Sequence, residues 1–203
     1  TVPETGVALL RVAGLGGGVG VPYEMAPPFD YGPDVIEAYS AMVHRAMENL
    51  DIELGFEPGR VIVANAGILV TRVLYVNERP DRQFLVVDAA MNDLVRPAMY
   101  EAYHEIWPVT EPAADAPRVA YDVVGPVCET GDTFTTGRVL PEIHPGDLIA
   151  LKSAGAYGAT MSSTYNQRPL VAEVLVRGDK FAITRPRQSY EDLIGQDRMP
   201  DWF

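Results

Sequence analysis

Residues 7–23 read VALLRVAGLGGGVGVPY, and this stretch decides the class of fold. Its apolar start predicts a buried strand, and the glycines that follow predict a loop. Apolar residues then recur at helical spacing over residues 34–50, which predicts an amphipathic helix. IELGF at 52–56 predicts a second strand. Strand, glycine-rich loop, helix and strand in this order indicate a βαβ unit with two parallel strands.

The rest of the chain changes to short strands separated by Gly, Pro and Asp. A helix that runs into a strand is expected over residues 61–76, and a short helical segment over 94–106. The other expected strands are at 83–91, 119–125, 147–153, 170–178 and 180–186. Their spacing is typical of a small antiparallel barrel or sandwich. We therefore predict an α/β domain over residues 1–65 and a β domain over residues 66–203, ending in a helical turn capped by Ser189.

Composition and charge narrow the classes of function. The formal net charge of −12 argues against a nucleic-acid partner, because phosphates must be neutralised by Lys and Arg, and against an anionic membrane surface. No apolar run reaches the length of about 18 residues that a membrane helix needs, and the N-terminus lacks the pattern of a signal peptide. One cysteine cannot form an intrachain disulfide. These features together favour the cytoplasm.

Loops follow both predicted strands of the βαβ unit. GGGVG at 16–20 is not a dinucleotide fingerprint, because the G-x-G-x-x-G spacing fails. Glycines after a strand still let backbone N–H groups approach a phosphate; a tight turn is the alternative. EPGR at 57–60 places a carboxylate and a guanidinium at the same edge of the sheet, where ligands bind. It suits a charged, nitrogen-bearing ligand, and an ordinary turn with a surface ion pair is the alternative.

Two further stretches offer ligand-binding side chains. Arg96 and Tyr100 are four residues apart, so in a helix they share a face and could clamp a carboxylate. The alternative is a solvated arginine and a half-buried tyrosine. Residues 153–166 are rich in small side chains around Tyr157, which suits a loop where an aromatic ring meets a flat ligand, or a corner of a barrel.

Metal and serine-hydrolase motifs are incomplete. HEIWP begins like H-E-x-x-H at His104, but its fifth residue is Pro108. His44 and His144 have no partners at ligand spacing, and no G-x-S-x-G occurs. We therefore expect no metal site.

The single cysteine, Cys128, lies in GPVCETGD at 125–132. An inert core cysteine usually has apolar neighbours, whereas this one follows Gly-Pro and precedes an acidic residue. The sequence predicts that the thiol lies in a turn, a position more typical of a cysteine with a chemical role than of one in the core.

Five motifs in a fixed order connect these features: LGGGVGVPY (15–23), EPGR (57–60), VDAAMNDLVRPAMYEAYHEI (87–106), VVGPVCETGDTF (123–134) and DLIALKSAGAYGATMSSTYNQRP (147–169). Together they resemble the C-terminal half of the diaminopimelate decarboxylases, which are fold type III pyridoxal-phosphate enzymes related to ornithine decarboxylase. That family folds as a TIM barrel followed by a β domain and works as a head-to-tail homodimer. The resemblance implies that the first 65 residues are the last two βα units of the barrel.

The resemblance also implies how the cofactor, pyridoxal 5′-phosphate, is bound. Its phosphate would be held by backbone amides of the glycine loop, with help from the EPGR turn. Glu57 matches the acid beside the pyridine nitrogen, which keeps that nitrogen protonated so that the ring accepts electrons. The residues implied for the phosphate are Gly16, Gly17, Gly18, Gly59 and Arg60.

Substrate residues follow from the same resemblance. Three residues match the family's groups that hold the distal amino-acid end of diaminopimelate: Arg60, Arg96 and Tyr100. Tyr157 matches a family tyrosine that contacts both cofactor and substrate. Cys128 matches the cysteine that reaches into the partner subunit's active site and protonates the carbon after decarboxylation. Glu129 matches the acid that recognises the distal ammonium. Ornithine-specific relatives carry aspartate there and would lack the Arg96/Tyr100 pair.

The chain departs from the family pattern at the Schiff-base lysine. That lysine lies in the first barrel strand, and Lys152 and Lys180 match no such position. Gly14 also stands where the family tends to have an acidic residue. A complete barrel takes about 250 residues. We therefore expect a C-terminal fragment that does not catalyse decarboxylation alone.

Three functions are consistent with the sequence. The first is part of a diaminopimelate decarboxylase, a cytoplasmic enzyme of lysine biosynthesis. The second is a pyridoxal-phosphate decarboxylase of another basic substrate, of the ornithine, arginine or carboxynorspermidine type; Arg96 and Glu129 count against it. The third is a non-catalytic dimerisation module on the same fold.

Overall fold

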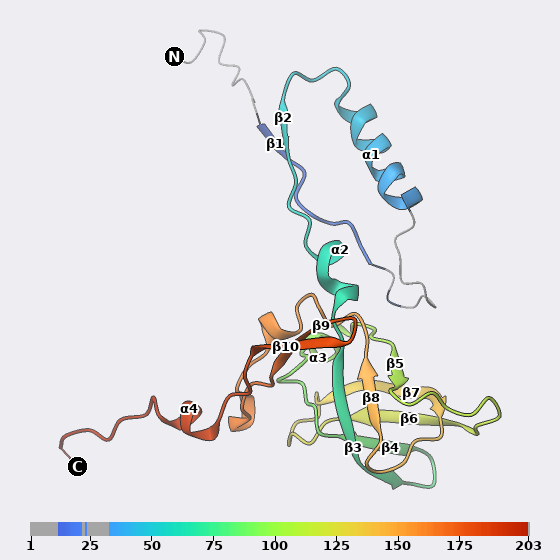
Figure 1. Ribbon diagram of the computed structural model, residues 1–203, viewed down its shortest axis with the longest axis vertical. Coiled ribbons are helices and arrows are strands. Elements are labelled where there is room, and N and C mark those ends of the chain that lie inside the picture. The colour runs from blue at the N-terminus through green and yellow to red at the C-terminus, as the bar shows by residue number, and fades with distance from the viewer. Residues whose placement is uncertain (1–11, 22, 24–32, 203) are drawn as a thin grey trace.

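The computed structural model of the protein describes residues 12–21, 23 and 33–202 (Figure 1). Of the strand predicted over residues 7–12, only Val12 lies in this range; β1 spans Val12–Gly14, and its residues are exposed or partly exposed rather than buried. Helix α1 (Pro33–Met47) and strand β2 (Glu53–Gly55) follow, and β1 pairs with β2 in parallel. The predicted βαβ order is confirmed. The two described strands form a two-stranded sheet, and their place as the last two βα units of a TIM barrel stays a prediction.

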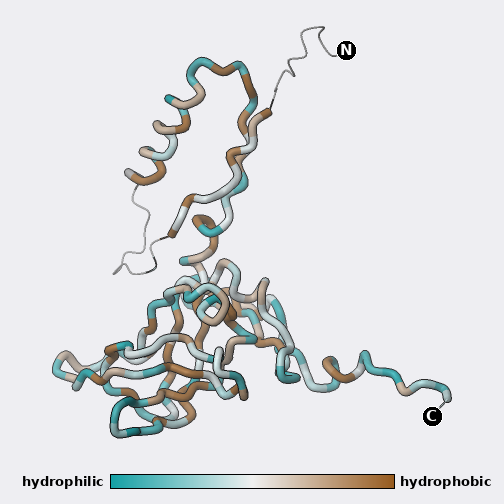
Figure 2. The backbone as a smooth tube through the Cα atoms, turned by 180° about the vertical axis from the view of Figure 1, so that it is seen from behind, coloured by the Kyte–Doolittle hydropathy of each residue, from teal (hydrophilic) through white to brown (hydrophobic). Residues whose placement is uncertain are grey.

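The described residues up to 59 form an arm that stands away from the remainder of the molecule (Figures 1 and 2). Its helix α1 is amphipathic as predicted, but most of its apolar face is exposed. Val35 and Met42 are 47% and 51% exposed, whereas Val43 is buried. The arm therefore displays an apolar helix face that other elements of the described chain leave largely uncovered.

A sheet domain, residues 60–188, forms the larger part of the structure. The chain enters it through α2 (Arg60–Val63) and the 3-10 turn η1 (Ala64–Ala66), and continues into the long strand β3 (Leu69–Glu78). This confirms the helix that runs into a strand. The six-stranded sheet has the order β5-β8-β3-β4-β6-β7. The remaining bounds are β4 (Gln83–Val87), β5 (Ile106–Pro108), β6 (Arg118–Val124), β7 (Thr133–Pro141) and β8 (Leu148–Leu151).

The sheet is mixed rather than purely antiparallel, which corrects the prediction. β4 and β6 are parallel, whereas the other neighbours are antiparallel. The reason is that helix α3 (Arg96–Tyr100) and β5 lie between β4 and β6 in the chain, so β6 returns in the same direction. The edge strands β5 and β7 contact each other, so the sheet curls nearly into a barrel. Neither strand was predicted: β5 is only 3 residues long, and β7 is interrupted by Gly137.

The core lies inside this curl. Leu85 and Val87 from β4, Val123 from β6 and Ile149 from β8 are fully buried. Tyr121 is also buried, and its hydroxyl accepts a hydrogen bond from Ile143 N at 3.2 Å. Each such apolar side chain contributes about 1.5–3 kcal/mol when fully buried. The sheet domain is therefore held by a continuous apolar core.

A hairpin and a tail complete the described chain. The hairpin consists of β9 (Glu173–Arg177) and β10 (Lys180–Arg185), as predicted. The tail contains α4 (Tyr190–Ile194), which Ser189 caps: its Oγ accepts from Asp192 N at 3.0 Å, and the Asp192 carboxylate accepts from Ser189 N. The predicted cap is confirmed. The tail extends away from the sheet domain (Figure 1).

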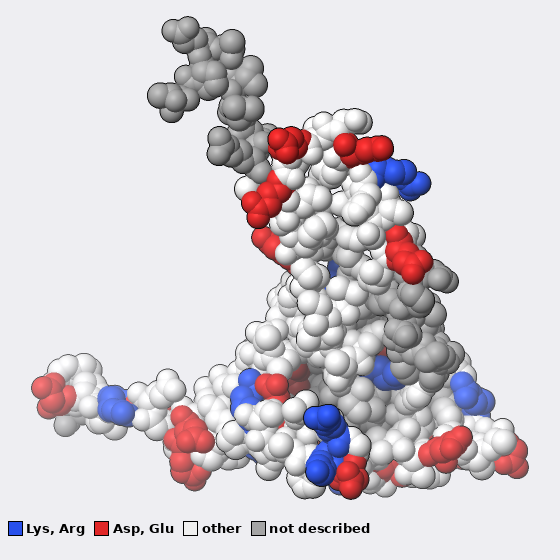
Figure 3. All heavy atoms as spheres, turned by 45° about the horizontal axis from the view of Figure 1, so that its top comes forward, with Lys and Arg blue, Asp and Glu red and all other residues white. Residues whose placement is uncertain are grey.

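The surface carries both signs of charge. On the face shown in Figure 3, Lys and Arg side chains are interspersed with Asp and Glu side chains over the arm and the sheet domain. Among the described helices, none has the length and apolar character needed to cross a membrane.

Candidate active site

The glycine loop packs directly on the turn that follows β2. Glu57 N donates a hydrogen bond to Gly16 O at 2.8 Å, and Leu15 N donates to Gly55 O at 2.9 Å. A Cβ added at Gly17 would lie 2.6 Å from Glu57 O, so no other residue fits there without movement. Gly16 and Gly18 have φ of +64° and +85°, in the left-handed region that favours glycine. The parallel pairing of β1 and β2 thus brings both predicted loops together.

The loop that carries Tyr157 joins the same place from the sheet domain. A Cβ added at Gly59 would lie 3.9 Å from the Tyr157 hydroxyl. Tyr157 has φ of +60° and is 48% exposed, so its ring stands at the surface. The structure therefore brings together the glycine-loop cluster, which we define as Gly16, Gly17, Gly18, Glu57, Gly59 and Tyr157. Arg60, the first residue of α2, follows this cluster directly.

Close backbone contacts fix the Tyr157 loop in place. Gly155 N donates to Ala64 O at 3.0 Å, and Ala154 N donates to Gly67 O at 2.8 Å. A Cβ at Gly155 would collide with Val63 O, so this glycine is needed for the approach. The loop and η1 are consequently one unit at the junction of arm and sheet domain.

Arg96 and Tyr100 lie in α3, as predicted, but in opposite environments. Arg96 is 8% exposed, whereas Tyr100 is 59% exposed. Arg96 Nη1 lies 3.1 Å from His104 Nε2, and the Tyr23 ring covers the guanidinium with its centroid 5.1 Å from Cζ. The picture of a solvated arginine with a half-buried tyrosine is therefore wrong.

Lys152 occupies a different environment from a cofactor-linked lysine at the glycine loop. Its ammonium lies 3.5 Å from the centroid of the Trp107 ring and 3.8 Å from a Glu105 carboxylate oxygen. Burial lowers the pKa of Lys152, and the Glu105 charge opposes that shift. Its contacts thus tie it to strand β5 and the residue before it.

The turn that carries Cys128 is organised by a buried carboxylate, Asp132. Its two oxygens accept hydrogen bonds from Val127 N and Met91 N, each at 2.7 Å. A Cβ at Gly125 would collide with this carboxylate, which explains the glycine before the turn. Burial raises the pKa of Asp132, whereas the bonds from Val127 and Met91 lower it. Asp132 therefore shapes the thiol turn, residues 125–132.

Cys128 and Glu129 are both exposed on this turn. The Tyr165 hydroxyl donates to Glu129 Oε2 at 3.3 Å, and Gly131 N donates to Glu129 Oε1 at 3.2 Å. The Glu129 charge raises the pKa of Tyr165, with smaller contributions from burial and from Cys128. Thiol, carboxylate and phenol therefore share one edge of the domain.

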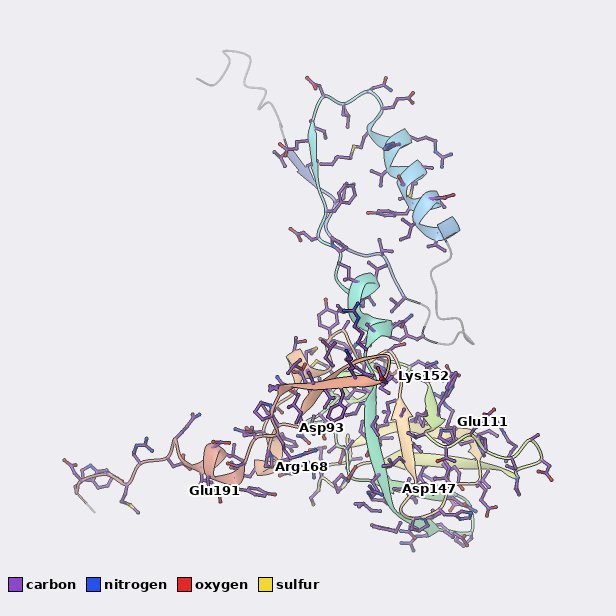
Figure 4. The ribbon with its side chains drawn as sticks, in the orientation of Figure 1. Asp93, Glu111, Asp147, Lys152, Arg168 and Glu191 are labelled. Carbon is purple, nitrogen blue, oxygen red and sulfur yellow. The ribbon has the colours of Figure 1, made fainter. Side chains whose placement is uncertain are left out.

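A second polar network supports the loop that contacts the thiol turn. Asp93 accepts a hydrogen bond from Ala90 N at 2.9 Å and lies 3.8 Å from Arg168, and Figure 4 shows both side chains. Arg168 Nε donates to Asn92 Oδ1 at 2.9 Å. Burial raises the pKa of Asp93, and the Ala90 bond and the Arg168 charge oppose this. Beside the network lies a cavity of 470 Å³ that reaches Arg187 and Glu191.

Residues 29–155 match the family of pyridoxal-dependent decarboxylases, in their C-terminal sheet domain. The chain belongs to this family. It is 49% identical over 194 residues to the diaminopimelate decarboxylase of Zymomonas mobilis, which covers 96% of this chain and 45% of that protein. The Pseudomonas fluorescens diaminopimelate decarboxylase is 47% identical over 95% of this chain and 44% of its own length. The chain therefore spans about half the length of the curated relatives it matches.

A solved structure shows the same similarity. The diaminopimelate decarboxylase of Helicobacter pylori in complex with L-lysine matches 92% of this chain and 44% of its own, at 42% identity with a TM-score of 0.79. The similarity includes the arm as well as the sheet domain, because the covered share exceeds the sheet domain alone.

Several residues contribute to the candidate site although the sequence alone did not indicate them. They are Tyr23, Asp93, His104, Asp132, Tyr165 and Arg168. Asp132 had a readable signal, since an acidic residue at the end of a Gly-containing turn often bonds nearby backbone amides. His104 was considered only as a metal ligand, and the described residues contain no group of three or more His, Cys, Asp or Glu side chains that could hold a metal ion.

Proposed function

We propose that this chain supplies part of the active site of a pyridoxal-phosphate-dependent diaminopimelate decarboxylase. The reaction removes one carboxyl group of meso-2,6-diaminopimelate as CO₂ and leaves L-lysine. The observation that carries the proposal is the convergence of glycine loop, Glu57 and Tyr157 from separate parts of the chain. Family membership and the names of the most similar relatives support it.

The glycine-loop cluster fits the cofactor. The space beside Gly16 and Gly18 is open, and Gly17 has no room for a side chain, so backbone amides can face a phosphate. Gly59 and Arg60 extend the cradle, and Arg60 adds a positive charge. Glu57 is exposed, and its carboxylate would accept a hydrogen bond from the protonated pyridine nitrogen. When bound there, pyridoxal phosphate supplies the electron sink for the electrons left behind by departing CO₂.

Substrate recognition uses charges of both signs. Arg60, Arg96 and Tyr100 would bind the carboxylate at the distal end of the substrate, where arginine provides a planar fork of donors. Glu129 would accept from the distal ammonium, and Tyr165 holds one of its oxygens in place. Tyr157 lies at the junction of cofactor and substrate. A substrate with a second amino-acid end is therefore favoured over ornithine.

Cys128 would deliver the proton that replaces the carboxyl group. Its turn is exposed, and the hydrogen bonds described for it connect it to Met91, Glu129 and Tyr165 rather than to the glycine loop. We assign the thiol of one subunit to the active site of its partner in a homodimer. The domain division at residues 65 and 66, and a cytoplasmic location, belong to the same proposal.

The lysine that carries the cofactor would come from outside these 203 residues, because Lys152 is committed to Trp107 and Glu105. The chain alone would then release no CO₂ from meso-diaminopimelate. Co-expression with the N-terminal half of the Zymomonas mobilis relative should produce activity, and Cys128→Ser in this chain should abolish most of it. Ornithine and arginine serve as competing substrates.

Either of two results would refute the proposal. One is activity of the complemented enzyme on ornithine or arginine but not on diaminopimelate, which would favour the other decarboxylases. The other is a visible absorbance band, formed by this chain alone with pyridoxal phosphate, that borohydride abolishes while it leaves the cofactor covalently attached to the chain. That adduct would show that Lys152 or Lys180 bears the cofactor.

A further inference from the structure

The position of Arg96 depends on one neighbouring side chain. Within the part of the chain that the structure describes, its one side-chain hydrogen bond runs from Nη1 to His104 Nε2 at 3.1 Å. Arginine carries about five N–H donors in a planar fork and has no acceptor. The bond to His104 thus uses a single donor and fixes the plane of the guanidinium, while other donors can bind a carboxylate.

The bonding pattern of His104 permits only one form of its ring. Nε2 faces a donor that stays charged, so Nε2 must be the acceptor. Nδ1 lies 2.8 Å from Lys152 O, an acceptor, so Nδ1 must carry the proton. The neutral Nδ1–H tautomer satisfies both partners, whereas an imidazolium would point an N–H at the guanidinium.

The surroundings favour that neutral form. His104 is 2% exposed, and the Tyr23 ring meets it edge-on at 5.7 Å. Burial lowers the pKa of His104, the Arg96 charge lowers it further, and the Lys152 carbonyl opposes the shift. The charged groups around it are Arg96 from α3 and, beyond the Lys152 carbonyl just after β8, the Lys152–Glu105 ion pair.

Resting on the function proposed above, we infer that His104 is a positioning residue that holds the Arg96 guanidinium in the orientation that receives the substrate carboxylate. The contact joins three elements that are distant in sequence: α3, the end of β8 and the segment after the glycine loop. A histidine that merely fills the core would need only the Lys152 bond. The acceptor at Nε2 is what a positioning role requires.

Two substitutions separate these roles because asparagine and glutamine imitate different ring nitrogens. In His104→Asn, the amide can replace Nδ1 and donate to Lys152 O, but it is too short to reach Arg96. In His104→Gln, the longer amide can place its oxygen near Nε2 and accept from Arg96. The ligand is L-lysine, the proposed product, which keeps the distal carboxylate. Cadaverine, the same molecule without the carboxylate, is the control ligand.

Titration calorimetry measures binding of both ligands to the enzyme formed by co-expressing this chain with the N-terminal half of the Zymomonas mobilis relative, and nitrogen-15 NMR of the 203-residue chain reports on the histidine rings. We expect His104→Asn to weaken L-lysine binding about tenfold or more and His104→Gln to stay within about threefold of the unchanged chain. Cadaverine binding should be the same in all three. NMR should show His104 neutral and protonated at Nδ1. In the unchanged chain, L-lysine affinity should fall on acidification as His104 takes up a proton, and cadaverine affinity should not.

The opposite results would overturn the inference. Equal losses in both variants, a loss confined to His104→Gln, or an imidazolium at neutral pH would leave His104 a structural residue. If His104→Asn does not fold, the NMR tautomer and the acid dependence of the unchanged chain decide the question. Failure of the proposed function looks different: the co-expressed enzyme with the unchanged chain would bind no L-lysine, so Arg96 would have no carboxylate to receive.

Discussion

The arm and the sheet domain use similar amounts of apolar sequence in different ways. In the sheet domain, apolar side chains of β3, β4, β6 and β8 turn inward, and several are fully buried. In the arm, α1 and β1 expose apolar residues such as Val35, Met42 and Val12. Figure 2 shows brown, apolar positions along this helix. The sheet domain thus encloses an apolar core, whereas the arm has an apolar face that the described chain leaves largely uncovered.

This difference places the candidate site at the boundary between the two regions. The glycine loop and Glu57 come from the arm, and Tyr157 comes from the sheet domain. Tyr23 of the arm also covers Arg96 of the sheet domain. The candidate ligand-binding groups therefore come from both regions, the buried sheet domain and the more exposed arm.

The strongest way to test the comparison is to remove buried volume from each region. Leu85→Ala should lower the free energy of unfolding by about 2–5 kcal/mol, because it leaves a cavity in a fully buried position. Ile36→Ala in α1, at a side chain that is 45% exposed, should change it by less than about 0.5 kcal/mol. Urea denaturation followed by circular dichroism measures both. Equal losses would show that the arm is packed as tightly as the sheet domain.

A smaller effect is expected at the thiol turn. Asp132→Asn replaces one carboxylate oxygen with an N–H donor. Either Val127 N or Met91 N then faces a donor and loses its acceptor. We expect a loss of about 1–3 kcal/mol, the usual cost of leaving a buried polar group unsatisfied. The reaction rate of Cys128 with a thiol reagent should also change.

Asp115→Asn is the matched control for Asp132→Asn, since Asp115 is an exposed acid in a loop. It should leave both the stability and the thiol reaction rate unchanged. An unchanged thiol rate in Asp132→Asn, despite lower stability, would contradict the view that this carboxylate shapes the turn.

The sequence predicted the arm and most of the sheet domain because their signals are local. Helical spacing over α1 and the apolar run of β4 depend on neighbours in the chain, and both were found. β7 was missed because Thr133–Pro141 alternates weakly and contains Gly137, so only its pairing with β6 defines it. The parallel pairing of β4 and β6 was missed for the same reason: it depends on a crossover.

The candidate site shows the same contrast between features set by neighbours in the chain and features set by distant residues. The sequence indicates every residue that the resemblance assigns to the site, but it does not indicate the side chains that hydrogen-bond to those residues or their loops. Asp132 is five residues from Val127, one of its partners, whereas Met91, its other partner, is 41 residues away. His104 reaches Lys152 across 48 residues. Supporting residues of this kind become visible only when the chain is folded.

Acid should lower the stability of the folded chain because of His104, which lies at the boundary between the arm and the sheet domain. The unfolded chain takes up a proton at this histidine as the pH falls through 6.5, its ordinary value, whereas the folded chain resists until lower pH because burial lowers the pKa. The free energy of unfolding should therefore fall with acidification just below 6.5, by at most about 1.4 kcal/mol per pH unit. Urea denaturation at several pH values measures this slope.

His104→Gln should remove that part of the slope, whereas Asp115→Asn should keep it. Asp93 and Asp132 act in the opposite direction at lower pH, because their pKa values are raised by burial and protonation above 3.8 favours the folded state. A slope of unchanged size in His104→Gln would show that other groups produce it.

The smallest effect is expected in the tail, which neither region covers. Ser189→Ala removes the side-chain oxygen that accepts from Asp192 N, so α4 loses its cap. Because α4 has no buried residues, the loss should stay local: NMR should show the amide of Asp192 exchanging faster, while the urea midpoint of the sheet domain stays the same. Ser189→Asp keeps an acceptor at the cap and should preserve the helix. A midpoint shift as large as that of Asp132→Asn would mean instead that the tail packs on the sheet domain, beside the cavity that Tyr190 and Glu191 line.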